Sequence, residues 1–336
     1  MKKKILSIIL AIVSVVSCFA LTACSNNTNT VRIVVPDGAP ALSVTTVIKD
    51  GIKMPQDTKL QIDIVKADTI TSEVTGKKCD IAILPSNAAF KIYNDSVKNG
   101  DKAPYVMLAT ATYGNLFVVG KTTLTSISDL TGKIVYSIGQ GAVPHKILEK
   151  VAGLNSIELN IITDKKDAIQ GKINVIFVSD GLEVNTNLKE DATAFGLLGE
   201  PAVTGSKKQG NVVSLDVQAE YQKATNSTEK GYPQAVVVAR KSFIESNGEI
   251  IKTFLQKMVA NMDYVNNKDN QKTITDVLKG NKYGNPSATT FPPQSISGCN
   301  IIVKSTKTAK QDVVTFLKTL TGAPKIADGF FYEIEY

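Results

Sequence analysis

The sequence predicts an α/β protein of two lobes, each a mainly parallel sheet flanked by helices. Short apolar runs typical of strands alternate with helical patterns over 31–115. The same alternation restarts near Ile134, after a segment in which two apolar runs follow each other with no helix between them. The chain after the N-terminal signal, about 310 residues, is too long for one typical single-core domain and sufficient for two lobes.

The second lobe is predicted to be an insertion in the first. Apolar, β-prone residues at two crossings, 112–120 and 232–240, mark the hinge between the lobes, and glycine or proline stands in each. We expect the second crossing to pair beside 116–119 in the neck. The first lobe is then assigned to 31–115 and 241–336, and the second to 116–240.

The elements follow from periodicity and from turn residues. In the first lobe, strands are expected at 31–36, 60–65 and 80–84, and helices at 42–51, 67–78 and 86–93, the last capped by Ser86 or Asn87. In the second lobe, strands are expected at 134–138, 157–162, 173–178 and 195–198, where the lobe closes, and helices at 165–170, 182–188 and in the segment that ends at Gly153.

After the second crossing the sequence predicts a return to the first lobe. Helices are expected at 242–245, 248–265, 269–279 and 310–320, with 291–305 mostly extended. The longest helix has one apolar face, made of Ile250, Ile251, Phe254, Leu255, Met258 and Val259. The C-terminal segment offers Phe330, Phe331 and Tyr332 for packing on the first lobe.

The N-terminus has the layout of a secretory signal. Lysines at positions 2–4 precede an apolar run over 5–21, which serines interrupt and which is short for a bilayer-spanning helix, the alternative interpretation. Residues 21–24, Leu-Thr-Ala-Cys, resemble the lipobox of a bacterial lipoprotein. That resemblance implies a signal peptide at 1–23, lipid (palmitate) on Cys24, and attachment to the extracytoplasmic face of the cell membrane. The polar residues 24–30 are expected to form a flexible tether.

Charge and cysteine content exclude several classes of function. The formal charge is +7, and removing the three lysines of the signal leaves 7 − 3 = +4. Basic residues do not cluster with aromatic ones, so nucleic acid is not an expected partner. The only arginines are Arg32 and Arg240, and neither falls in a predicted cleft loop. Beyond the signal and Cys24, Cys79 and Cys299 remain; they are expected to be separate buried thiols, with a disulfide as the alternative.

Two segments resemble a known group of proteins. The first is Lys-Cys-Asp-Ile-Ala-Ile-Leu-Pro-Ser-Asn-Ala-Ala over 78–89, and the second is Ser-Asp-Leu-Thr-Gly-Lys over 128–133. With the inserted lobe, they resemble the nitrate, sulfonate, taurine and thiamine-precursor group of ABC-transporter binding proteins, which have the type II periplasmic-binding-protein fold. The resemblance implies transport of a small organic or anionic solute, a monomer, and ABC permease subunits as partners. The chain departs from that group in having no tryptophan.

Ligands of α/β sheets bind beyond the carboxyl ends of the strands, where loops and helix N-termini converge. This rule selects loops of both lobes as candidates. The Gly-Gln-Gly turn at 139–141 would expose N–H groups to an oxygen, or it is an ordinary strand-to-helix turn. The predicted ligand-binding residues are Asp37, Gly38, Ala39, Ser86, Asn87, Thr112, Tyr113, Asn115, Gln140, Gly141, Ala142, His145, Ser179 and Asp180.

Several of these residues have an alternative interpretation. Tyr113 would stack on a ligand or would pack in the neck, and Asp180 would bind a cationic or hydroxylated ligand or lie on a solvated rim. His145 is the only histidine, and no Ser/His/Asp set or metal-ligand spacing accompanies it. We therefore expect neither catalysis nor a cofactor or metal. The alternatives to a transport role are an extracytoplasmic enzyme, related to pyrimidine-synthesising members of the fold, and a ligand-sensing lipoprotein.

Overall fold

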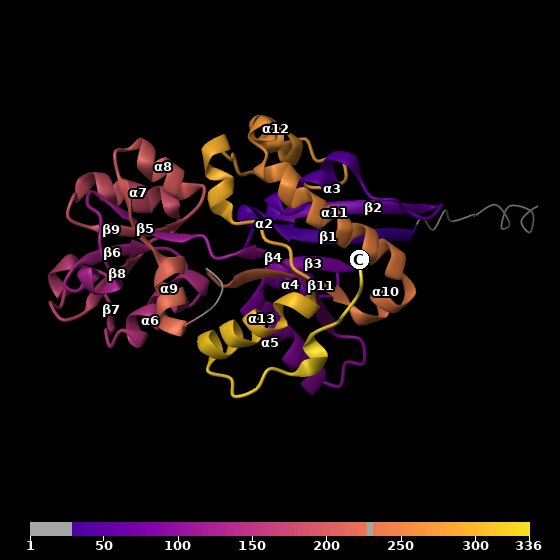
Figure 1. Ribbon diagram of the computed structural model, residues 1–336, viewed down its shortest axis with the longest axis horizontal. Coiled ribbons are helices and arrows are strands. Elements are labelled where there is room, and N and C mark those ends of the chain that lie inside the picture. The colour runs from indigo at the N-terminus through magenta and orange to yellow at the C-terminus, as the bar shows by residue number, and fades with distance from the viewer. Residues whose placement is uncertain (1–28, 227–230) are drawn as a thin grey trace, which may run out of the picture.

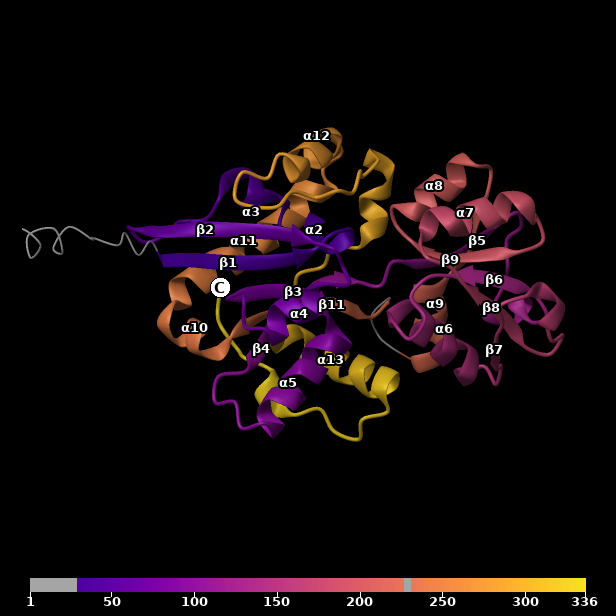
Figure 2. The same cartoon turned by 180° about the vertical axis from the view of Figure 1, so that it is seen from behind.

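A computed structural model describes residues 29–226 and 231–336. The predicted signal and Cys24 lie outside the described residues. Two sheets with helices on their faces form two lobes that lie side by side along the long axis (Figures 1 and 2). The predicted α/β, two-lobe architecture is confirmed. Within the described ranges, no helix is both long and apolar enough to cross a bilayer.

The first lobe is built on a five-stranded sheet of order β2-β1-β3-β11-β4. Its strands are β1 (Asn29–Pro36), β2 (Thr58–Val65), β3 (Ile81–Pro85), β4 (Tyr105–Tyr113) and β11 (Pro233–Arg240). β1 pairs in parallel with β2 and β3, and β11 runs antiparallel between β3 and β4. The tether prediction over 24–30 therefore extends too far, because Asn29 and Thr30 already pair with Thr58 and Lys59.

The prediction that 232–240 pairs beside 116–119 is wrong. β11 belongs to the first sheet over its whole length, and its partners are β3 and β4. Val236, Val237 and Val238 are at most 1% exposed, as expected of a strand covered on both faces. An apolar run of this kind indicates a central strand but does not identify which strands flank it.

Helices cover both faces of the first sheet. In Figure 1, α3, α11 and α12 lie on one face, and α4, α5 and α13 lie on the other. The helices of this lobe are α2 (Ala39–Leu42), α3 (Thr45–Asp50), α4 (Ile70–Thr75), α5 (Ser86–Lys98), α10 (Lys241–Ser246), α11 (Gly248–Asn266), α12 (Lys268–Lys279) and α13 (Thr306–Thr321). The single helix predicted at 42–51 is two short helices, since the first ends at Ser43. On the longest helix the predicted apolar face is buried except for Val259, which is 38% exposed.

The predicted cap of α5 differs from the observed one. The N-cap residue is Pro85, and no side chain caps the helix. Ser86 is instead its first residue, and the Ser86 hydroxyl donates a 2.5 Å hydrogen bond to the Pro233 carbonyl. This bond joins the start of α5 to β11. The polar side chain at position 86 therefore serves a tertiary contact and does not cap the helix.

The second lobe is built on a six-stranded sheet of order β10-β5-β9-β6-β8-β7. Its strands are β5 (Leu116–Gly120), β6 (Ile134–Ser137), β7 (Leu159–Ile161), β8 (Ile173–Phe177), β9 (Phe195–Gly199) and β10 (Val212–Asp216). β6, β7, β8 and β9 are parallel, whereas β5 is antiparallel to β9 and β10. The helices are α6 (Val143–Leu154), α7 (Gly181–Glu190), α8 (Ala202–Lys208) and α9 (Val217–Thr225). The prediction that this lobe closes at 195–198 is wrong, because α8, β10 and α9 follow.

The two crossings meet in a neck made of glycines and an aromatic stack. The Gly114 amide donates to the Tyr232 carbonyl at 2.9 Å. The ring of Tyr232, which is fully buried, stacks on Phe316 of α13 with centroids 5.1 Å apart, and Tyr221 contacts both rings edge-on. Because Val313 and Leu317 of the same helix pack in the first lobe's core, α13 joins the cores of the two lobes behind the neck.

The C-terminal segment packs on the first lobe, as predicted. Phe330 is fully buried between Phe90 and Tyr93, with ring centroids 5.5 Å from each. The Tyr332 amide donates to the Met107 carbonyl at 2.9 Å. Cys79 and Cys299 are free, buried thiols in the same core.

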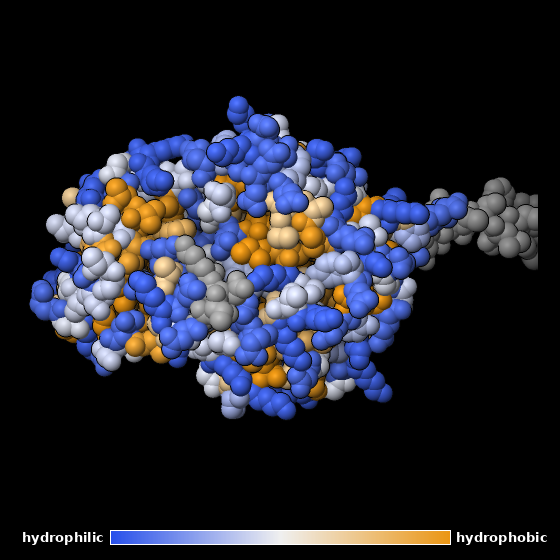
Figure 3. Space-filling view, in the orientation of Figure 1, coloured by the Kyte–Doolittle hydropathy of each residue, from blue (hydrophilic) through white to orange (hydrophobic). Residues whose placement is uncertain are grey.

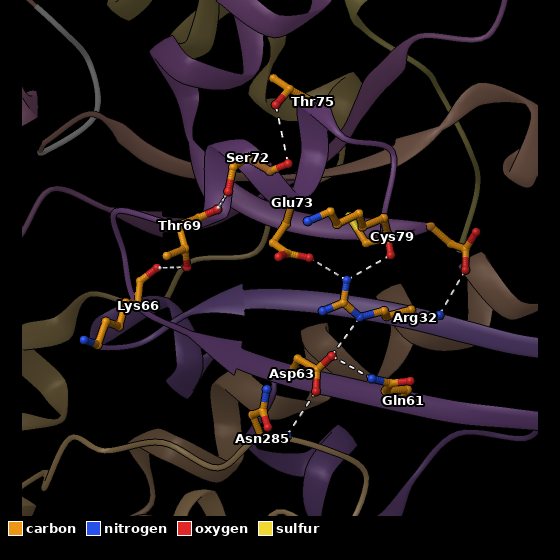
Figure 4. Close-up of polar contacts among 12 residues, drawn as sticks. Arg32, Gln61, Asp63, Lys66, Thr69, Ser72, Glu73, Thr75, Cys79 and Asn285 are labelled. Carbon is orange, nitrogen blue, oxygen red and sulfur yellow. Dashed lines mark hydrogen bonds and ion pairs between the residues drawn. The ribbon is translucent and has the colours of Figure 1, made fainter.

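Arg32 organises a polar cluster that joins β1, β2 and α4 (Figure 4). Its guanidinium donates to Asp63 at 2.8 Å, to Glu73 at 2.6 Å and to the Lys78 carbonyl at 2.9 Å. Arg240 forms an ion pair with Asp80, whose other oxygen accepts the Arg32 amide. Both arginines are therefore committed to holding the first lobe together.

Candidate functional site

A cleft of about 440 Å³ lies between the lobes, where strand ends of both sheets converge. The first lobe contributes the ends of β1 and β3 and the start of α2, and β11 contributes its first residues. The second lobe contributes the segments that follow β6 and β9 and the starts of α6, α7 and α8. The lining residues are Pro36, Asp37, Ala39, Pro40, Ala67, Pro85, Asn115, Leu116, Ile138, Ala142, Val143, Pro144, Gly181, Leu198, Gly199, Glu200, Pro201, Ala202, Gln234 and Ala235.

A larger hollow, about 800 Å³, lies elsewhere, against the C-terminal residues 333–336. Only first-lobe residues line it. Its charged side chains are two lysines, Lys304 and Lys307, and two glutamates, Glu333 and Glu335. The interlobe cleft is the better candidate, because both lobes line it and it lies at the carboxyl ends of parallel strands.

The structure places Asp37, Ala39, Asn115 and Ala142, among the predicted site residues, in the lining of this cleft. Sequence analysis did not select the segment 198–202, nor Gln234 and Ala235. The rule that would have found 198–202 is the one used for the other loops: a buried strand ends at Gly199, and an acidic residue, a proline and a helix follow.

Asp37 lines the cleft, but its carboxylate is fully engaged within the first lobe. One oxygen accepts from the Gly38 amide at 2.9 Å and from the Ser287 hydroxyl at 2.6 Å. The other accepts from the amides of Ala288 and Thr289, at 2.9 and 3.2 Å. Four accepted bonds fill the capacity of a carboxylate. Asp37 therefore fastens the loop at 287–289 to the end of β1.

The other predicted residues of the first lobe lie beside the cleft or in the neck. Gly38 has φ +99° and links Asp37 to α2. Thr112 is 1% exposed within β4, and Asn87 has a buried carbonyl oxygen without a partner in the described part of the chain. Tyr113 is also 1% exposed, and its hydroxyl is 3.1 Å from an Asp312 carboxylate oxygen. Tyr113 thus occupies the neck, the alternative position considered for it.

In the second lobe, the Gly-Gln-Gly turn is closed by the histidine that follows it. The Gly141 amide donates to Nδ1 of His145 at 2.9 Å, so this N–H is not directed at the cleft. The His145 ring lies edge-on to Phe177 at 4.9 Å, and burial lowers the pKa of His145. A neutral imidazole is required for Nδ1 to accept this bond. Gln140 and Gly141 are exposed and are absent from the cleft lining.

Ser179 and Asp180 cap α7 and do not line the cleft. The Asp180 carboxylate accepts from the amides of Leu182 and Glu183, both at 2.9 Å. The Ser179 amide and hydroxyl both donate to the Glu183 carboxylate, and these bonds lower the pKa of Glu183. The Asp180 and Glu183 carboxylates thus both accept hydrogen bonds from residues at the start of this helix.

Glu200 is a partly buried carboxylate in the cleft lining. Its two oxygens accept from Thr204, one from the amide at 3.0 Å and one from the hydroxyl at 2.9 Å. Burial raises the pKa of Glu200, and the bonds from Thr204 oppose that shift. The side chain also reaches the first lobe, because a Cβ built on Gly298 would be 2.8 Å from its Cγ. Glu200 therefore lies where the lobes face each other.

Two side-chain amides of the lining have unused hydrogen-bonding groups. Asn115 is 5% exposed, lies over Gly199, and makes no side-chain hydrogen bond within 29–226 and 231–336. The carbonyl oxygen of Gln234 is buried and has no partner in the same ranges. Buried polar atoms are nearly always paired, so such atoms in a cleft indicate groups that a ligand would satisfy. No cluster of potential metal ligands occurs among the described residues.

No protein-family model matches the sequence, and no curated protein matches it. Solved structures do. The structure of an ABC transporter from Parabacteroides distasonis is similar over 92% of this chain and 100% of its own, with a TM-score of 0.67 at 17% identity. The fold is that of ABC-transporter solute-binding proteins. The ligand-binding component of an ABC-type import system from Staphylococcus aureus, solved with zinc bound, has a TM-score of 0.60 at 12% identity over 90% of this chain and 96% of its own.

The periplasmic aliphatic sulphonate-binding protein of Escherichia coli has the same fold, with a TM-score of 0.59 at 12% identity over 89% of this chain and 95% of its own. These similarities bear out the resemblance seen in the sequence at the level of fold. At such identities the fold carries no information about the ligand.

Proposed function

We propose that this protein is the lipid-anchored, extracytoplasmic substrate-binding protein of an ABC importer. In this role the two lobes close on a small solute and present it to the permease subunits, and the chain acts as a monomer without cofactor or catalysis. The observation that carries the proposal is the cleft itself. It is shared by two lobes that two crossings and α13 connect. It contains the Asn115 side-chain amide and the buried Gln234 carbonyl oxygen, which make no hydrogen bond to any residue that the structure describes.

The alternative of an extracytoplasmic enzyme finds less support. The cleft lining contains no serine, cysteine or histidine that would act as a nucleophile or base among the described residues. His145 accepts a bond from Gly141 and contacts Phe177 instead. A binding role needs only the shape and polar groups that the cleft offers.

Filling the cleft tests the binding role. Ala142 is exposed and lines the cleft, so Ala142→Trp should occupy it without disturbing a core. Thr186→Trp, on an exposed position of α7, is the matched control. Each protein is incubated with the small-molecule fraction of a bacterial extract, desalted and analysed by mass spectrometry. We expect the wild type and Thr186→Trp to retain a compound that Ala142→Trp loses; retention by all three would contradict the assignment of the cleft.

The anchor is tested by fractionation. Cys24→Ala should release the protein from membranes, because lipid on Cys24 is the proposed attachment, whereas the neighbouring Ser25→Ala should stay bound. A Cys24→Ala protein that remained in the membrane fraction after a salt wash would exclude lipid anchoring at this position.

A further inference from the structure

The charge of the cleft is one-sided. Among the described residues that line it, the ionisable side chains are Asp37 and Glu200, and there is no lysine, arginine or histidine. Both arginines of the chain are engaged in the first lobe's ion pairs, away from this lining. An anionic ligand would therefore find two carboxylates and no side-chain cation with which to form an ion pair.

Proline and internal hydrogen bonds remove several of the backbone donors that an oxoanion could use at this cleft. Oxoanions commonly bind the free N–H groups of helix N-termini. Here Pro40 and Pro144 occupy the first turns of α2 and α6, and Pro201 is the N-cap residue of α8, so these positions have no N–H to donate. At α7 the Asp180 carboxylate already accepts two first-turn amides. At α8 the Thr204 amide is bonded to Glu200.

The two carboxylates differ in what they can still accept. Asp37 already accepts four hydrogen bonds from its own lobe. Glu200 accepts two, both from Thr204, and a carboxylate has acceptor sites for about four. Glu200 is thus the acidic group of the cleft with capacity for a ligand. Its partial burial also leaves its charge poorly solvated, and a hydrogen-bond donor or a cation from the ligand would restore the lost stabilisation.

The remaining polar groups suit the same kind of ligand. The amides of Asn115 and Gln234 each offer donors and an acceptor without net charge. The other lining residues are proline, alanine, glycine, valine, isoleucine and leucine. A ligand that matches this surface has a mainly apolar body and a few hydrogen-bonding groups.

We infer that the cleft takes an uncharged or cationic organic molecule whose N–H groups are bound by Glu200, with Asn115 and Gln234 completing the hydrogen bonds, and that it excludes oxoanions such as sulfonate and nitrate. This inference rests on the proposed function and selects the organic branch of its ligand range. Glu200 is then the specificity-determining residue, and its contact with Gly298 places it where closure of the lobes would complete the site.

The test identifies what the full chain captures. The protein is purified in detergent, stripped of bound compounds by washing in denaturant and refolding, and incubated with the small-molecule fraction of a bacterial extract. Retained compounds are identified by mass spectrometry, and the affinity of each is measured by calorimetry. Benzylamine and benzenesulfonate, which share an apolar ring and differ in charge, serve as defined probes and compete with the retained compound.

The inference predicts that retained compounds carry N–H groups and are neutral or cationic, and that benzylamine competes better than benzenesulfonate. Glu200→Gln should bind the retained compound roughly tenfold more weakly, while Glu183→Gln, an acidic residue of the neighbouring α7 cap, should bind normally. The unliganded Glu200→Gln protein should melt no earlier than wild type, since it loses a partly desolvated charge. This melting temperature separates lost recognition from lost folding.

Retention of sulfonates, nitrate or other oxoanions would overturn the inference and leave the proposed function intact. Unchanged affinity in Glu200→Gln would overturn the role of Glu200. Retention of no compound by the refolded wild type would contradict the proposed function and, with it, this inference.

Discussion

The neck of the molecule makes the sharpest mutational prediction. A Cβ built on Gly114 would lie 2.6 Å from Cζ of Tyr232 and 2.7 Å from Cε1. The Tyr232 ring cannot withdraw freely, because its other side stacks on Phe316 at 5.1 Å. Gly114→Ala should therefore overpack the neck and lower the free energy of unfolding by about 1–3 kcal/mol. Equilibrium urea denaturation measures this change.

Gly153→Ala is the matched control for the same change of side chain. Gly153 is an exposed residue of α6, and a Cβ there would have no neighbour within 4 Å. Alanine at this position should raise the free energy of unfolding by about 0.4–1 kcal/mol, since it restricts the unfolded chain without strain in the helix. If Gly114→Ala were as stable as wild type, the Tyr232 ring would have room to move away from residue 114, and the close packing described for the neck would be wrong.

Three further predictions concern Asp37, His145 and the binding of free α-amino acids. Asp37→Asn should lower the free energy of unfolding by roughly 1–3 kcal/mol in urea denaturation, because the asparagine amide cannot accept all four bonds. Asp68→Asn, at an exposed position, is the control and should leave the unfolding midpoint unchanged. If Asp37→Asn and wild type had equal midpoints, the anchoring role of Asp37 would be refuted. The pKa of His145 is lowered by folding, so the unfolded chain binds more protons below about pH 6.5. Stability relative to His145→Gln should fall as the pH decreases through that value, and parallel pH curves would refute it. Free α-amino acids should not bind, because neither arginine lines the cleft; micromolar binding of any of them by calorimetry would count against this reasoning.

Local sequence patterns predict most elements because their causes are local. The strand before Pro36 and the strand before Pro85 end where proline and polar turns stop an apolar run. By contrast, the position of β11 depends on which strands it contacts across more than a hundred residues. The run of valines indicates that the strand is buried, but it does not indicate which strands pair with it.

The candidate site shows the same division. The general rule about strand ends selected Asn115 and Ala142, and both line the cleft. The rule could not tell which polar side chains are available to a ligand, since that depends on contacts from distant segments. Asp37 is occupied by the loop at 287–289, whereas Glu200 keeps acceptor capacity. The segment that contains Glu200 also follows 195–198, the last strand predicted before the second crossing.

The surface adds a feature that sequence analysis did not anticipate. Figure 3 shows hydrophobic side chains at the surface of both lobes. Leu182, next to the cleft residue Gly181, is 73% exposed. A large apolar side chain at the rim of a cleft would lose contact with water when the lobes close, and its burial would favour the closed state.

The central claim, that two lobes close on a ligand, is tested most directly by a distance between them. Asp68→Cys on the first-lobe rim and Leu182→Cys on the second provide exposed sites for spin labels, while the native Cys79 and Cys299 are buried. Pulsed electron paramagnetic resonance then measures the distance between the labels with and without the compound retained by the wild type. The account predicts a shorter and narrower distance distribution when that compound is bound. An unchanged distribution at saturating compound would contradict closure as the mechanism.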